Sequence, residues 1–410
     1  MKILVLNAGS SSQKSGLYDI SGAPADSDQK QPVHPLWEAQ IDWLSQENAA
    51  RINIVTAAGE YFDELRTVSS RQETLSYLLA RLSQSPTKVI DSLKEIDAVG
   101  HRVVHGGKEY QNSTLITPKV KTTIDRLSAL APNHNPANLE GIVLMEQLLA
   151  DAPQVAVFDT AFHSQMPPVA STYPGPYDWL AQGIRRYGFH GISHQFCAQR
   201  AAQLLGRDLG SLRLIICHLG NGGSLSAVRG GKSIDTTMGF TPLDGLMMGT
   251  RSGTVDPGIL IHLMRQGMQV DDLDKLLNKQ SGLLGISGIS HDLREIEKAV
   301  EKGNAQAQLA KDLYLHRLKA CIGAMLMSLG GLDSLVFTAG IGENSPGVRA
   351  AVCEAMAFLG VEIDLKKNQN SPVDEDIATE GAKVRVLVIH TQEDWAIAQA
   401  CWSHLQAGNH

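Results

Sequence analysis

The sequence lacks the features that mark several common classes of protein. It contains no uninterrupted apolar run long enough for a membrane-spanning helix. Its five cysteines are odd in number and widely spaced, so neither a disulfide framework nor a zinc site is indicated, and we expect reduced, mostly buried thiols. No basic tail or stripe accompanies the formal net charge of -7, which argues against nucleic acid as a partner.

The composition is typical of a soluble globular protein. A chain of 410 residues predicts two or three domains, and 43% hydrophobic with 19% charged residues supports a large buried core. Only four apolar residues directly precede Asn7, too few for the apolar segment of a secretory signal. We therefore expect a cytoplasmic enzyme or binding protein that does not associate with a membrane.

A glycine-rich turn between two apolar runs is the most informative local feature. Residues 212–228 predict a strand that ends near His218, a turn at Gly220–Gly223, and a second strand. Glycines in such a turn can present bare backbone N–H groups to a phosphate. Taken alone, an ordinary structural hairpin explains the pattern better, and other parts of the chain must decide.

Two further turns follow the same pattern. Residues 2–20 predict strand, polar turn and strand, which suggests two similarly built halves, and the strand at 334–338 leads into Ala339–Gly342. Three such turns suit a nucleotide held from several sides, with phosphates at the first two and the nucleoside at the third. None of them is a P-loop or a dinucleotide-binding fingerprint.

Strands alternate with helices along the chain, which predicts an α/β fold. Ser193 is the expected cap of a helix that stops near Gly206. Other helices are expected at 72–82, 120–130, 137–149 and 305–329 and from Glu393 onward, with strands at 36–43, 155–158 and 384–389 and within 98–107.

Four basic side chains stand next to these turns and strand ends. Arg102 and Arg251 lie beside glycines, where a guanidinium can reach an oxyanion. His190 and His218 stand at a motif tip and a strand end. Considered singly, each arginine could equally form a surface ion pair, and a structural histidine bonded to backbone is the more common case.

Six segments together resemble the signature segments of acetate kinases, in family order and from Met1 to the C-terminal helix. They are Asn7–Lys14, Gly100–Gly107, Phe158–His163, Arg186–Gly191, His218–Gly222 and Phe337–Asn344. The resemblance implies two duplicated ribonuclease H-like domains, the actin-like ATPase fold of sugar kinases and Hsp70, with the active site in the cleft between them. The expected domains are 1–154, completed by 391–410, and 155–390.

The resemblance also implies an activity. It is the reversible transfer of the ATP γ-phosphoryl group to acetate, giving acetyl phosphate and ADP, in a homodimer that uses Mg²⁺, for which Mn²⁺ can substitute. A propionate or other short-chain acyl kinase is the alternative within the family. A chaperone-like or filament-forming ATPase is the alternative from another class, but the chain has no added peptide-binding domain.

A carboxylate acceptor is ionised at neutral pH, so no general base is needed to remove a proton from it. The main requirement is to relieve the repulsion between this carboxylate and the negatively charged phosphoryl group that it attacks. We assign Arg102 and Arg251 to a cationic clamp on the transferring group, with His190 and His218 as further donors. The family resemblance implies the same four residues. It also implies a role for Asp159, which more plausibly orients an arginine or the metal shell than removes a proton.

The remaining site residues follow from the resemblance. Asn7 and Glu393 match metal positions, in line with the few protein oxygens that Mg²⁺ usually takes. Phosphate contacts are expected from Gly220, Asn221, Gly222 and His218, with Ser10, Ser12 and Lys14 opposite them. Adenosine contacts are expected from Asp292, Arg294, Gly340, Ile341, Gly342 and Asn344. An alternative for Asp292 and Arg294 is a helix N-terminal charge pair.

The acyl pocket departs from the family pattern. The resemblance implies a lining of Val104, Phe189, Pro242 and the residue before His134, with Arg102 close to the substrate. The family usually has leucine before that histidine, whereas this chain has Asn133. A buried amide without a hydrogen bond costs free energy. Either Asn133 turns away, which we favour, or the pocket is wetter than usual.

Overall fold

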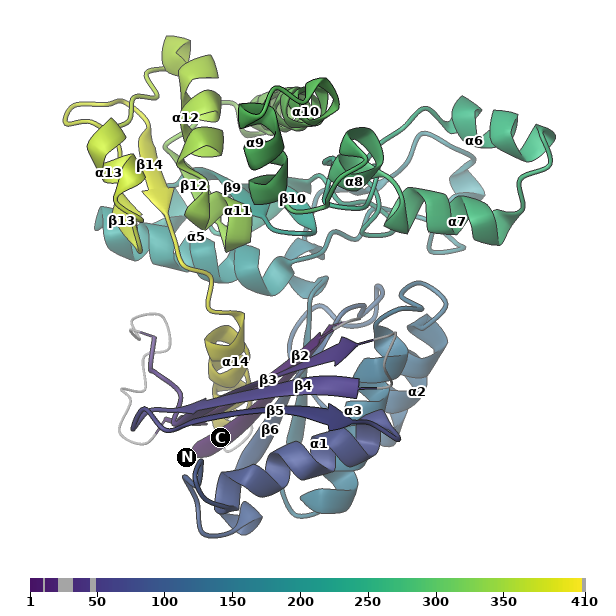
Figure 1. Ribbon diagram of the computed structural model, residues 1–410, viewed down its shortest axis with the longest axis vertical. Coiled ribbons are helices and arrows are strands. Elements are labelled where there is room, and N and C mark those ends of the chain that lie inside the picture. Colours follow the sequence, from purple (N-terminus) through teal and green to yellow (C-terminus); the bar gives the residue numbers. More distant parts are fainter. Residues whose placement is uncertain (10–11, 21–31, 45–48, 408–410) are drawn as a thin grey trace. The chain divides into compact units, whose positions relative to one another are not determined.

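The computed structural model describes residues 1–9, 12–20, 32–44 and 49–407 (Figure 1). The chain forms two compact units. The first consists of Met1–Ala161 together with Gln392–His410, and the second of Phe162–Thr391. Among the described residues, no helix is both long and apolar enough to cross a membrane.

The first unit is built on an eight-stranded sheet with the order β5-β4-β3-β2-β1-β6-β8-β7. Its strands are β1 (Lys2–Ala8), β2 (Ser12–Asp19), β3 (Trp37–Leu44), β4 (Ala49–Thr56), β5 (Tyr61–Thr67), β6 (Ala98–Val103), β7 (Thr114–Leu115) and β8 (Gln154–Phe158). Its helices are α1 (Arg71–Ala80), α2 (Pro118–Leu127), α3 (Asn135–Leu148) and α14 (Glu393–Ala407). Helices α1 and α3 contribute Leu75 and Met145 to a core with Trp37.

The second unit is built on a six-stranded sheet with the order β11-β10-β9-β12-β14-β13. Its strands are β9 (Arg213–Leu219), β10 (Gly223–Arg229), β11 (Lys232–Thr236), β12 (Ser334–Thr338), β13 (Glu375–Asp376) and β14 (Arg385–Val388). Its helices are α4 (Pro168–Ser171), α5 (Gly191–Leu205), α6 (Pro257–Arg265), α7 (Val270–Lys279), α8 (Gly282–Ser287), α9 (Leu293–Glu301), α10 (Ala305–Leu329), α11 (Ala339–Asn344), α12 (Pro346–Ala355) and α13 (Leu365–Gln369).

The two sheets share one topology. In the first, β1 pairs antiparallel with β2 and parallel with β6, which pairs parallel with β8. In the second, β9 pairs antiparallel with β10 and parallel with β12, which pairs parallel with β14. The outer strands match as well, since β3 and β11, and β7 and β13, are all antiparallel to their neighbours. The six-strand order β3-β2-β1-β6-β8-β7 is therefore duplicated, which confirms the expected α/β fold.

Two expectations need correction. The strand at 155–158 was assigned to the second domain, but β8 pairs with β6 in the sheet of the first unit. Ser193 was expected to cap a helix, but α5 already begins at Gly191 and its N-cap residue is His190 in a left-handed conformation (φ 56°). Glycine is the usual residue in that region of backbone conformation, so a histidine there does not indicate this early start. Gly206 ends α5 as predicted.

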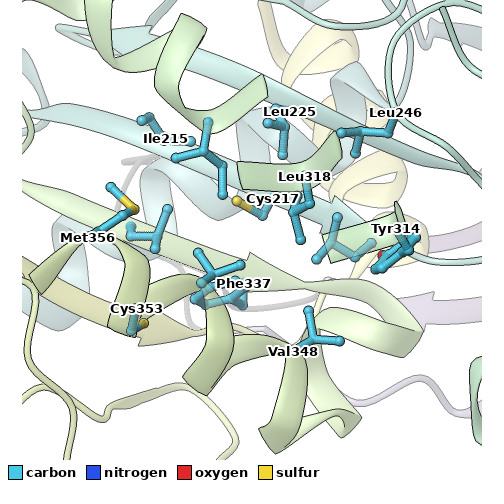
Figure 2. Packing of buried hydrophobic residues seen from close by; sticks show 14 of the residues in the cluster. Ile215, Cys217, Leu225, Leu246, Tyr314, Leu318, Phe337, Val348, Cys353 and Met356 are labelled. Atoms are coloured by element: carbon cyan, nitrogen blue, oxygen red, sulfur yellow. The ribbon is translucent and has the colours of Figure 1, made fainter. Parts of the chain in front are cut away.

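Strand alternation separates the core of the second unit from its polar face. Ile215, Cys217 and Leu225 point into a hydrophobic cluster that contains Tyr314 and Leu318 from α10 (Figure 2). Because successive side chains on a strand face opposite sides, the residues between them on β9 and β10 face away from that cluster. Helix α5 covers this other face of the sheet (Figure 1). The five cysteines are all free, in agreement with the expectation of reduced thiols.

A buried histidine in the first sheet gives a pH prediction. The His101 side chain on β6 is 2% exposed, its Nε2 lies 2.7 Å from Gln154 Oε1, and burial lowers its pKa to about 4. The unfolded chain, with an ordinary histidine pKa near ~6.5, binds protons that the folded protein excludes, so stability falls as the pH drops. We expect His101 alone to contribute about 2 kcal/mol to the stability lost between about pH 7.5 and about pH 5, measured by urea unfolding.

The matched pair for this experiment is His101→Gln and His34→Gln, because His34 is exposed. The first change should flatten the pH dependence and the second should preserve it. Equal slopes for both variants would show that His101 does not cause the effect.

Candidate active site

Polar side chains of the first unit gather where its parallel strands end. Asn7 lies near the end of β1, Arg102 near the end of β6, and Asp159 directly after β8. Glu393 opens helix α14, which packs on these strands. The carboxyl ends of parallel strands meet at one edge of a sheet, so residues 386 positions apart in sequence become neighbours there. Four residues of the sequence prediction are thus brought together.

Arg102 is held in place by two partners. Its Nη2 donates to Asp159 Oδ2 at 2.8 Å, and its Nη1 donates to Asn7 Oδ1 at 3.2 Å. The Asp159 side chain is 1% exposed. Burial disfavours the Arg102 charge, but the negative charges of Asp159 and Glu393 outweigh it and hold the Arg102 pKa above its usual range. This guanidinium is therefore charged and oriented before any substrate binds.

Asn7 links the arginine to two carboxylates on α14. Its Nδ2 donates to Asp394 Oδ1 at 2.7 Å and lies 3.5 Å from Glu393 Oε2. Asp394 was not predicted, although its position next to Glu393 at the start of a helix is a signal that could have indicated it. Burial raises the Asp394 pKa, an effect that the Asn7 hydrogen bond opposes. In the part of the chain that the structure describes, no group of three or more His, Cys, Asp or Glu residues is arranged to bind a metal.

The other predicted residues of this unit differ in their settings. Val104 follows β6 and is buried, and its N–H donates to Asn138 Oδ1 at 3.2 Å. Asn138 also donates to the carbonyl of Ala8 at 3.2 Å, so this unpredicted residue ties the ends of β6 and β1 together. Asn133 is exposed.

Three residues were expected near the phosphates from this unit. Ser12 opens β2, and its carbonyl accepts a 2.8 Å hydrogen bond from the Gly9 N–H. Lys14 is exposed two residues further along the strand. Ser10 lies outside the described residues.

The phosphate turn predicted in the second unit is a tight loop of Gly220, Asn221 and Gly222 between β9 and β10. The Gly220 N–H donates to the carbonyl of Gly222 at 3.0 Å, and Gly249 donates to the carbonyl of Asn221 at 3.0 Å. A Cβ at Gly222 would stand 3.3 Å from Arg251 Nη1 and 3.7 Å from His190 Nε2. Both basic groups therefore lie against the backbone of this turn.

The two predicted histidines stack on each other. The rings of His190 and His218 are 4.1 Å apart between centroids and inclined by 20°. His190 Nδ1 lies 2.9 Å from Ser224 Oγ, and His218 Nδ1 lies 2.8 Å from Ser193 Oγ. Ser193 does not cap the helix as expected, and its Oγ also lies 2.9 Å from Thr391 Oγ1. Serine hydroxyls thus orient both imidazoles through their Nδ1 atoms.

Arg251 is half-buried and has no carboxylate partner among the described residues. Within the described chain, its hydrogen bonds run from Nη1 to the carbonyl of Pro242 at 3.3 Å and to the sulfur of Met248 at 3.9 Å. Burial lowers the pKa of Arg251 below its usual range. The predicted acyl-pocket residue Phe189 is 1% exposed, and its carbonyl lies 3.0 Å from His163 Nε2.

A pocket of about 380 Å³ lies beside the phosphate turn within the second unit. The predicted residues in its lining are Gly220, Asn221, Asp292, Arg294, Gly340, Ile341 and Asn344, and the unpredicted ones are His291, Leu293, Glu297 and Ser345. Pockets of this size hold small organic ligands. The structure thus joins the predicted phosphate and adenosine segments in one site.

Some adenosine-side expectations change in detail. Residues 339–344 form the short helix α11 rather than an open turn, and Ala339 has a left-handed φ of 64°. Gly342 is buried, and a Cβ there would stand 3.4 Å from the carbonyl oxygen of Cys217, so this glycine permits close packing and does not line the pocket. Asp292 caps α9 and pairs with Arg294 at 2.6 Å, as the charge-pair alternative predicts.

A duplicated α/β fold, basic groups beside a glycine turn, and a pocket of about 380 Å³ are features of a nucleotide-binding enzyme. The model of the acetokinase family matches residues 2–399. The chain is 65% identical to the acetate kinase of Acaryochloris marina over 98% of this chain and 99% of that protein, and 62% identical to that of Trichormus variabilis over the same shares. The chain belongs to the acetokinase family.

Solved structures agree with this assignment. The crystal structure of Porphyromonas gingivalis acetate kinase is 42% identical, with a TM-score of 0.89 over 98% of this chain and 99% of that one. A propionate kinase from Francisella tularensis is 38% identical, with a TM-score of 0.87 over the same shares.

Proposed function

We propose that this protein transfers the γ-phosphoryl group of ATP reversibly to acetate, giving ADP and acetyl phosphate. The observation that carries the proposal is the pocket of the second unit, which joins the Gly220–Gly222 turn to α9 and α11. Glycine N–H groups suit the phosphates, and the cavity beside them suits the nucleoside. The full-length similarity to acetate kinases supports the acceptor.

The reaction chemistry is consistent with the side chains present. An acetate oxygen attacks the γ-phosphorus, the bond from that phosphorus to the β,γ-bridging oxygen breaks, and ADP leaves with the electron pair. No proton has to be removed from acetate. We assign Arg102 and Arg251 to the charge that develops on the transferring group, and His190 and His218 to further hydrogen bonds. Asp159 is assigned to the orientation of Arg102, which it contacts.

The oxygen donors at the end of β1 and the start of α14 fit a magnesium ion. Asn7 and Glu393 carry an amide and a carboxylate oxygen, the hard ligands that Mg²⁺ prefers. Glu393 Oε2 lies 3.5 Å from Asn7 Nδ2, and Asn7 Oδ1, which accepts from Arg102, would turn from that arginine to the ion. Few protein ligands are expected, since Mg²⁺ keeps waters and phosphate oxygens. We propose that these two residues hold it, and that it neutralises phosphate charge when bound.

Acetate is the proposed acceptor in preference to propionate. The chain shares 58–65% identity with eight curated acetate kinases and 38% with the propionate kinase of known structure. We assign Val104, Phe189 and Pro242 to the acyl pocket. Asn133 replaces the leucine usual in the family, and its exposure fits a pocket in which it does not line the methyl group.

We further propose that the protein is a cytoplasmic homodimer. Its five free cysteines suit a reducing compartment. Helix α6 contains no buried residue, and Ile261 and Met264, three positions apart on one face of it, are each about half exposed. Exposed apolar surface of this kind usually marks a contact with another protein. A second copy of the chain is the occupant that the family resemblance supports.

Activity provides the first test. Purified protein with ATP, Mg²⁺ and acetate should form acetyl phosphate, trapped as the hydroxamate by hydroxylamine, and should prefer acetate to propionate. Arg102→Ala and Arg251→Ala should each lower kcat about 100-fold or more, because each removes a cation from the developing charge. ADP affinity, measured by calorimetry, should change little.

Arg51→Ala is the matched control, since it removes an exposed arginine paired with Asp63 and should keep wild-type activity. ATP hydrolysis without hydroxamate from any acid would overturn the kinase assignment. Wild-type turnover in the Arg102 or the Arg251 variant would contradict the role assigned to that arginine.

The pocket provides a second test. A Cβ at Gly340 meets no atom within 4 Å, so Gly340→Leu should fold normally and fill the cavity. We expect its ADP dissociation constant to rise at least about ten-fold, a loss of ~1.4 kcal/mol. Gly323→Leu, at an equally open position on α10, is the control and should bind ADP like the wild type. Unchanged ADP affinity in the Gly340 variant would place the nucleotide elsewhere.

The surface of α6 provides a third test. Ile261→Glu puts a charge on its apolar face and should shift the protein from dimer to monomer in sedimentation velocity at micromolar concentration. Leu65→Glu changes a residue of similar exposure on β5 and should leave the dimer intact. A dimer that survives the Ile261 change unaltered would show that α6 is not the contact.

A further inference from the structure

A second histidine approaches His190 through a shared serine. Ser224 is fully buried on β10, and its Oγ lies 2.9 Å from His190 Nδ1 and 2.8 Å from His194 Nε2. His194 is one turn along α5 and is also fully buried. Neither Ser224 nor His194 belongs to the set of residues assigned above. The two imidazoles therefore meet at a single hydroxyl.

The hydroxyl couples the protonation of the two rings. Serine has one hydrogen and two acceptor lone pairs. Within the described chain Ser224 Oγ contacts only these two nitrogens, so its hydrogen goes to one of them and the oxygen accepts from the other. Burial, together with the neighbouring histidines, lowers the pKa of His194 well below its usual value, so this ring is neutral and carries one N–H. The position of that hydrogen then decides which way both hydrogen bonds between His194, Ser224 and His190 point.

The environment of His194 selects the direction. Its Nδ1 is buried and has no hydrogen-bond partner in the part of the chain that the structure describes. Either tautomer leaves this atom unpaired, as a donor or as an acceptor, and an unpaired buried N–H is the rarer of the two in native proteins. The hydrogen therefore belongs on His194 Nε2, which donates to Ser224, and the Ser224 hydroxyl donates to His190 Nδ1.

Resting on the function proposed above, we propose that Ser224 and His194 are positioning residues that hold neutral His190 in the tautomer with its hydrogen on Nε2. That nitrogen lies on the side of the Gly222 backbone and the Arg251 guanidinium. His190 then presents a hydrogen-bond donor to a phosphoryl oxygen without an added charge beside the arginine. In the opposite tautomer it would present a lone pair to an anion.

Solid-state ¹⁵N NMR of the full-length protein labelled at histidine tests this directly. The His190 signal is identified by its loss in His190→Gln, and we expect a protonated Nε2 and an unprotonated Nδ1. Ser224→Ala should shift His190 toward a mixture of tautomers. It should lower kcat about ten-fold or more while changing the KM for ATP less than about two-fold, because a donor used mainly in the transition state is lost.

Ser226→Ala is the matched control. Ser226 lies on the same face of β10 and is equally buried, but its hydroxyl contacts Ser233, so this variant should keep the wild-type kcat and His190 spectrum. His194→Gln retains an N–H donor toward Ser224 and should preserve activity, whereas His194→Phe should behave like Ser224→Ala. If His194→Phe does not fold, the two serine variants decide.

A hydrogen on His190 Nδ1 in the wild type would overturn the proposal, as would equal losses in Ser224→Ala and Ser226→Ala. The NMR measurement needs neither ATP nor acetate. Failure of the wild type to form acetyl phosphate would therefore overturn the proposed function and leave the tautomer assignment standing.

Discussion

The alternation of side chains along β9 and β10 is the constraint on which the second unit depends. Cys217 and Leu225 enter the hydrophobic core, so His218 and Ser224 must emerge on the opposite face, under α5. A slip of one residue would turn the polar set into the core and the apolar set toward α5. The register of the sheet therefore holds both the core and the orientation of the histidines, and neither can change without the other.

The sequence predicted those parts of the fold that have strong local signals. Helix α10 and strand β12 have the expected bounds, because Gly330 ends the helix and a short apolar run follows it. Strands β4 and β5 were not predicted. Strand β5 contains no buried residue, whereas β4 alternates Ala50, Ile52 and Ile54 into the core, a signal that could have indicated it. The early start of α5 depends on the left-handed backbone conformation of His190, which the residue type does not predict.

The same division holds for the candidate site. Its segments follow recognisable strands and turns, so most residues that line the nucleotide-sized pocket could be named in advance. Contacts that join distant segments could not. Ser224 is 30 positions from His194, and Asn138 is 130 positions from Ala8. Buried serine and asparagine residues have ordinary structural explanations when considered singly, and only the folded chain shows what they bridge.

The two arginines differ in how their charge is balanced. Arg102 stands beside Asp159, so the protein already compensates much of its charge. Arg251 faces a backbone carbonyl and a sulfur, and burial works against its charge. A bound anion therefore stabilises the charge of Arg251 more than that of Arg102, since it supplies the negative partner that the described chain does not.

The serines beside the histidines extend this argument. A carboxylate at His190 Nδ1 or His218 Nδ1 would fix the ring equally well, but it would favour an imidazolium and place a negative charge near the phosphates. The hydroxyls of Ser224 and Ser193 orient the rings at no cost in charge. Under the function proposed above, the arginines supply positive charge, and their guanidinium groups stay ionised throughout the neutral pH range.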